Sequence, residues 1–103
     1  MVLSKLEVSD LIKVPIFGYT AIIATYTVTA LDCVVNCTSG TFTINLPTAV
    51  GISGKVYTIK NSGAGIITVD ANGSETIDGN LTQIIIATSS MTILSDGANW
   101  III

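Results

Sequence analysis

The second half of the chain decides the fold. Residues 54–63 read Gly-Lys-Val-Tyr-Thr-Ile-Lys-Asn-Ser-Gly, residues 67–79 read Ile-Thr-Val-Asp-Ala-Asn-Gly-Ser-Glu-Thr-Ile-Asp-Gly, and residues 95–103 read Ser-Asp-Gly-Ala-Asn-Trp-Ile-Ile-Ile. Short β-branched runs alternate with Asn-Gly and Asp-Gly pairs, which supply the positive φ angles that tight hairpin turns need. We expect turns at 61–65, 71–74, 78–80 and 96–98, separated by strands of about five to eight residues. The pattern predicts an all-β fold, a small antiparallel β-sandwich or a β-prism-like meander.

The first half of the chain is expected to supply further strands. Residues 41–46 alternate between Phe42, Ile44 and Leu46 on one face and hydroxyl or amide side chains on the other. Residues 19–31 are expected to form one long strand, or two strands separated near Ala24, with three core residues: Ile23, Val28 and Leu31. Residues 32–37 form a short strand. Residues 82–88 and 91–95 are expected to pair as a hairpin closed at 89–90, which gives eight to ten strands and no helix.

Residues 1–16 are expected to form an extended arm, and residues 17–103 a single β domain. The arm mixes apolar residues with four charged ones, and its pattern fits a helical turn or a strand about equally. Pro15 lacks a backbone donor and favours extended geometry in the residue before it, so the arm is expected to end there.

The composition predicts self-assembly. Half of the 103 residues are hydrophobic, only 11% are charged, and the mean hydropathy is +0.74, whereas about 25% of residues are charged in an average soluble domain. The runs at 84–86 and 101–103 are continuously apolar, which predicts that both faces of these strands are covered. Neighbouring copies are the simplest cover, and the candidate interface residues are Ile84, Ile86, Trp100 and Ile102.

Other classes of partner fit the sequence poorly. Residues 14–31 are uncharged and nearly long enough to cross a membrane, but Pro15, Gly18 and four threonines interrupt them, so a strand is the better interpretation. No signal peptide is recognised at the start of the chain. Four scattered lysines and a net charge of −3 argue against a nucleic-acid surface, which needs clustered positive charge.

We find no constellation that predicts catalysis, a metal or a cofactor. The chain has no histidine, so zinc would need carboxylates beside Cys33 and Cys37. Those two thiols are interpreted as buried and free, with a disulfide as the alternative. Residues 70–75 resemble the start of a calcium loop but lack its later ligands, so a turn is preferred. Glu75 and Asp78 are interpreted as solvated charges, and Tyr57 and Trp100 as core or interface aromatics rather than a sugar-binding pair.

Four motifs in order resemble a β-rich module of bacteriophage virion proteins. They are Phe-Thr-Ile-Asn-Leu-Pro-Thr-Ala-Val-Gly at 42–51, Gly-Lys-Val-Tyr-Thr-Ile-Lys-Asn at 54–61, Thr-Val-Asp-Ala-Asn-Gly-Ser-Glu-Thr-Ile-Asp-Gly at 68–79 and Ser-Asp-Gly-Ala-Asn-Trp at 95–100. Such modules occur in tail fibres, tail spikes, head fibres and capsid decorations. The resemblance covers about 65 residues and implies a virion structural protein, commonly homotrimeric and without a cofactor.

The short segment before the module favours a capsid decoration, or cement, protein, because tail fibres usually carry a long shaft there. On this interpretation the partners are further copies of the chain and the major capsid protein or another virion protein. The arm is the expected capsid contact, through Leu3, Leu6, Val8, Leu11 and Ile12. The alternative is a tail-fibre tip or adhesin-like module that binds a host glycan through loops such as 47–54 or 71–74.

Overall fold

The computed structural model describes residues 18–103, which form nine β-strands and, within that range, no helix. The strands are β1 (Tyr19–Ile22), β2 (Tyr26–Thr27), β3 (Val34–Cys37), β4 (Phe42–Asn45), β5 (Val56–Asn61), β6 (Ile67–Asp70), β7 (Thr82–Ile85), β8 (Ser90–Ser95) and β9 (Trp100–Ile102). The all-β prediction is confirmed. The predicted arm at 1–16 lies outside the described residues.

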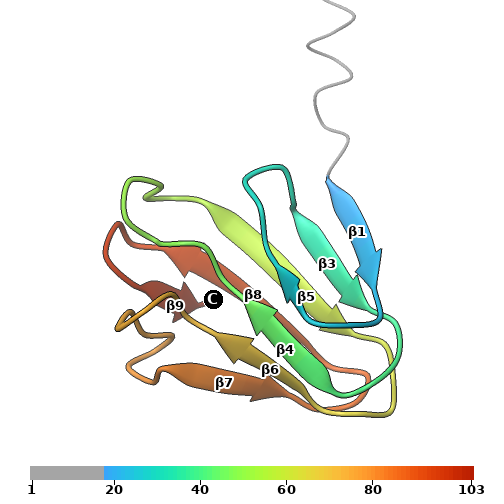
Figure 1. Ribbon diagram of the computed structural model, residues 1–103. Helices are drawn as coiled ribbons and strands as arrows, with labels where there is room; N and C mark the ends of the chain where they lie inside the picture. Colours follow the sequence, from blue (N-terminus) through green and yellow to red (C-terminus); the bar gives the residue numbers. More distant parts are fainter. Residues whose placement is uncertain (1–17) are drawn as a thin grey trace, which may run out of the picture.

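The strands form two sheets that pack as two layers (Figure 1). Sheet A has the order β1-β3-β5-β8-β9 and sheet B the order β2-β4-β6-β7. In each sheet the first three strands are parallel to one another, and the strands added after them are antiparallel. The two-layer arrangement agrees with the predicted small sandwich, but the predicted antiparallel pairing was wrong for the first three strands of each sheet, because both sheets are mixed.

The parallel pairing arises because the chain coils. The first six strands alternate between the two sheets, so each strand of sheet A is followed by one of sheet B. Parallel neighbours need a crossover connection, and here the intervening strand of the opposite sheet provides it. The expected break near Ala24 is confirmed, and it is the point where the chain first passes from sheet A to sheet B.

The expected hairpin between residues 82–88 and 91–95 was wrong. β7 pairs with β6 in sheet B, and β8 pairs with β5 in sheet A. Residues 86–89 instead carry the chain from one sheet to the other, with Thr88 at a φ of 63°. The amide of Asn61 donates to the carbonyl of Ser89 at 2.8 Å, which fixes this crossing against the end of β5.

The core lies between the two sheets. Tyr57 and Trp100 are both buried, with ring centroids 5.6 Å apart. Ile44 and Leu46 are buried and Phe42 packs against the same cluster, so the alternation predicted for 41–46 is confirmed. Val28 is also a core residue. Ile23 and Leu31 were predicted to be core but are 70% and 87% exposed, because Ile23 lies in a bend and Leu31 in a turn rather than in strands.

The two sheet-A edges differ. At β9, the amide of Trp100 donates to the carbonyl of Thr76 at 2.8 Å, and the amide of Asp78 donates to the carbonyl of Trp100 at 3.0 Å. The Asp78 carboxylate also accepts from the amide of Ile102 at 3.0 Å. This loop covers the β9 edge, whereas β1 is the terminal strand at the opposite side of the described sheet.

Candidate functional site

The outer face of sheet A is organised in three rows across its strands. Burial alternates along β5 and β8, so the half-buried and exposed side chains point away from the core. The first row, paired in register, is Val56, Leu94 and Ile101; the second is Tyr19, Val34, Thr58, Thr92 and Ile103; the third is Ala21, Asn36, Lys60 and Ser90. Thr58 and Thr92 share a hydrogen bond of 3.0 Å. Lys60 is the one charged residue in these rows.

The outer face of sheet B has the same layout. Its first row contains Ile66 and Ile86; its second is Thr25, Thr43, Thr68 and Ile84; its third is Thr27, Asn45, Asp70 and Thr82. Asp70 occupies the position that Lys60 occupies on sheet A. Ile66, Ile84 and Ile86 are all exposed, so this face carries an apolar patch beside a row of hydroxyls.

The four predicted interface residues have different surroundings. Ile84 and Ile86 are 60% and 59% exposed on the outer face of sheet B, and Ile102 is 37% exposed. Trp100 is only 1% exposed and packs on Tyr57, so within this chain it is a core residue. Its indole Nε1 has no hydrogen-bond partner. The five predicted capsid-contact residues, Leu3, Leu6, Val8, Leu11 and Ile12, lie outside the described part of the chain.

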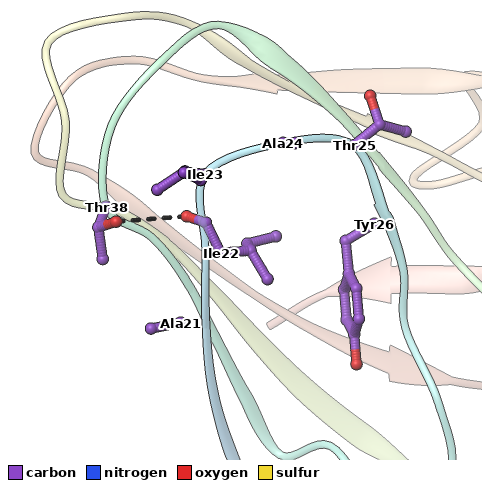
Figure 2. A pocket seen from close by; sticks show the side chains of 7 residues that line it. All are labelled: Ala21, Ile22, Ile23, Ala24, Thr25, Tyr26 and Thr38. Carbon is purple, nitrogen blue, oxygen red and sulfur yellow. Dashed lines mark hydrogen bonds between the residues drawn. The ribbon is translucent and has the colours of Figure 1, made fainter.

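A groove of about 470 Å³ lies at the bend between β1 and β2 (Figure 2). It is lined by Ala21, Ile22, Ile23, Ala24, Thr25, Tyr26 and Thr38. The Thr38 hydroxyl donates to the carbonyl of Ile22 at 3.3 Å. The lining holds no charged side chain, so it offers an apolar surface rather than a binding site for an ion.

A buried carboxylate connects the parts of the first coil of the chain, which comprises β1, β2 and the loop leading to β3. Asp32 is almost fully buried and accepts hydrogen bonds from the Thr20 hydroxyl at 2.5 Å, the Tyr26 hydroxyl at 2.7 Å and the Thr29 amide at 2.8 Å. Burial by itself raises the pKa of Asp32, but these hydrogen bonds together lower it below its ordinary value. The hydrogen bond to Asp32, followed by burial, raises the pKa of Tyr26. The cluster joins β1, β2 and the loop that leads to β3.

Glu75 and Asp78 were predicted to be solvated charges. Asp78 is exposed and Glu75 is half-buried, and each also accepts a hydrogen bond from a backbone amide. Glu75 joins the two loops considered for glycan binding: its carboxylate accepts from the Thr48 hydroxyl at 2.5 Å and from the Ala49 amide at 2.8 Å. The turn after β6 has Gly73 at a φ of 56°, and the amide of Glu75 donates to the carbonyl of Asn72. Loop 47–54 is therefore fixed beside the residue that follows loop 71–74.

Both thiols are free, as the preferred interpretation expected, but only Cys37 is buried as it also expected. Cys33 is half-buried before β3 and Cys37 is buried at its end. Burial raises the pKa of Cys37 to about 11, so this thiol is protonated at neutral pH.

Within residues 18–103, no three histidine, cysteine, aspartate or glutamate side chains gather as metal ligands would. The same residues contain no helix long and apolar enough to cross a membrane.

Comparisons with protein-family models, with curated proteins and with solved structures find no match to this chain. A functional interpretation therefore depends on the residues themselves. Sequence reasoning found the apolar residues of β7 and β9 but missed two features. These are the three-row layout common to both sheets and the Asp32 cluster. Both depend on which strands pair in parallel, and no local sequence pattern predicts that pairing.

Proposed function

We propose that this chain is a non-enzymatic structural protein of a bacteriophage virion, a homotrimeric capsid decoration or head-fibre protein that binds and stabilises the shell. The arm at 1–16 contacts the major capsid protein, and the β domain contacts further copies of itself.

One observation carries the proposal: both outer faces of the β domain expose apolar rows with a single charged residue each. One face carries the exposed residues Ile66, Ile84 and Ile86. The other carries exposed Val56 and Ile101 with half-buried Leu94 between them. Such surfaces are unusual for a chain that works alone, because contiguous exposed apolar patches mark interaction sites. Covering them against other virion subunits removes this surface from water. The resemblance of residues 42–100 to virion modules supports the same class.

The test of the arm is binding to emptied phage capsids. Replacing Leu3, Leu6 and Leu11 together with serine removes the apolar side chains while keeping the arm at full length. We expect this variant to lose co-sedimentation with capsids by at least tenfold, since each buried leucine contributes about 1.5–3 kcal/mol.

The matched control replaces Ser4 and Ser9 with alanine, which changes the same segment without removing apolar surface. It should bind like the unchanged chain. Both variants should keep the fluorescence of buried Trp100, which reports that the β domain is folded. Undiminished capsid binding by the triple serine variant would refute the arm's role.

A second candidate is a host-receptor module. Its supporting observation is that Glu75 holds loop 47–54 next to loop 71–74, which makes one combined loop surface with Val50 exposed. Binding of the purified chain to a glycan array, lost on substitution of Val50 and Asn72, would favour this candidate over capsid decoration.

A further inference from the structure

The two outer faces are alike in layout but opposite in charge. Along β5, Val56 is followed at two-residue intervals by Thr58 and Lys60. Along β6 and the residue before it, Ile66 is followed by Thr68 and Asp70. Four residues of strand span about 13 Å, so each charge stands the same distance from its apolar row.

The neighbouring strands repeat this correspondence. The third row of sheet A has Asn36, Lys60 and Ser90 side by side, and that of sheet B has Asn45, Asp70 and Thr82. The antiparallel segment beside each central strand adds an apolar residue to the first row. This residue is Leu94 on sheet A and Ile86, directly after β7, on sheet B. Along its central strand, each face thus passes from an apolar residue through a threonine to one charged residue, which has an amide and a hydroxyl side chain beside it.

We propose that copies of this chain associate by packing the outer face of sheet A of one copy on the outer face of sheet B of the next, with Lys60 opposite Asp70. The occupant of each apolar face is therefore a second copy of this chain. This inference deepens the self-assembly in the proposed function by naming which faces meet.

Pairing of like faces fits the charges less well. When two copies of sheet A meet about a two-fold axis along the strands, Lys60 lies opposite the partner's Lys60. When the axis runs across the strands, Lys60 lies opposite the apolar row with Val56. The first arrangement repels, and the second places a charge against an apolar surface without a partner. The same argument applies to Asp70 on sheet B.

The small area of each outer face also favours an arrangement in which both faces of a subunit are used. Four strands in sheet B and five in sheet A, at about 4.8 Å spacing and with five residues at about 3.3 Å rise, give faces of about 20 by 17 Å and about 24 by 17 Å. Both are below the roughly 800 Å² that each partner buries in a stable complex. A subunit that uses both faces, one toward each neighbour, makes two such contacts, so an assembly in which the contact repeats from copy to copy is held by more buried area per subunit than an isolated pair.

The experiment exchanges the two charges and measures self-association by sedimentation velocity over a range of concentrations. Lys60→Glu alone and Asp70→Lys alone should each weaken association by about tenfold, because each places like charges opposite one another. The double variant, which again places a negative charge opposite a positive one, should return to within about threefold of the unchanged chain. Leu31→Lys changes an exposed residue outside both faces and should have no effect.

Folding of each variant is checked first, because Lys60 also donates to the carbonyl of Thr88 at 2.6 Å. Lys60→Arg keeps the charge and should associate normally. The inference is overturned if the single reversals leave association unchanged, if the double variant is no better than the singles, or if the unchanged chain is monomeric at millimolar concentration. A monomeric chain that still binds capsids would overturn this inference and the proposed trimer but leave the capsid-binding role standing, whereas failure of the unchanged chain to bind capsids would overturn that role.

Discussion

At the scale of single residues, the described part of the chain buries one charged side chain, Asp32, and both of its carboxylate oxygens accept hydrogen bonds. Asp32 receives donors from Thr20, Tyr26 and Thr29, which come from β1, β2 and the loop after β2. Hydrogen bonds to an ionised acceptor are the stronger ones, and here they offset the cost of removing a carboxylate from water. The ionised form of Asp32 therefore stabilises the first coil.

We expect this stabilisation to disappear in acid. The pKa of Asp32 is lowered on folding, so its contribution is complete above the unfolded pKa of about 4 and is lost as the pH falls through the folded value. Asp32→Asn should lower the free energy of unfolding by about 2–3 kcal/mol at pH 7. Urea denaturation followed by Trp100 fluorescence should show the gap between the two proteins narrowing below pH 4. A gap that stays constant down to pH 2.5 would contradict this assignment.

At the scale of the elements, sequence reasoning succeeded where the determinants are local. The alternation at 41–46 and the turns at Gly73, Gly79 and Gly97 follow from side-chain period and positive φ, and the structure confirms them. The hairpin between β7 and β8 was wrong because adjacency in sequence does not decide which sheet a strand joins. That choice depends on contacts such as those of Asn61, which is remote from both strands in sequence.

Asn61 is buried at the end of β5 and joins three segments. Its side-chain amide donates to the carbonyls of Gly65 and Ile85, both at 2.9 Å, and its side-chain oxygen accepts from the amide of Gly63. The turn after β5 is thereby attached to the end of β7. Gly65 also approaches the backbone of Gly40 too closely for any β-carbon, so this turn is held on both sides.

Replacing Asn61 by alanine should lower the free energy of unfolding by about 2–4 kcal/mol, because the buried bond to Ile85 and the part-buried bonds to Gly65 and Gly63 are all lost. Asn36→Ala is the matched control. Asn36 bonds to Tyr19 and Ser62 on the outer face of sheet A, where water can replace these contacts, and a change below about 1 kcal/mol is expected. Chemical denaturation measures both values. Equal effects at the two positions would show that Asn61 has no special role.

At the scale of the whole molecule, stability is expected to be uneven across sheet A. β3, β5 and β8 have paired strands on both sides, whereas β1 is paired only with β3 in the described sheet. The sequence could not predict this gradient, because it depends on strand order rather than on strand composition.

Hydrogen exchange measured by mass spectrometry should therefore find amides of β1 exchanging at least tenfold faster than those of β5, since a terminal strand opens without disrupting the rest of the sheet. The amides of β9 should exchange more slowly than those of β1, because residues 76–78 bond to β9. Protection of β1 equal to that of β5 would mean that another segment or subunit covers its edge.

Because the edge of β9 is covered, the two ends of sheet A differ in whether another strand can pair there. The coil of parallel strands begins at β1 and β2, and at that end a further turn of chain would continue both sheets in register. At the other end, the strands reverse and the loop around Asp78 occupies the hydrogen-bonding groups of β9. Engineered strands could therefore be added beside β1 and β2 to lengthen the described domain, whereas the edge of β9 is closed to such an extension.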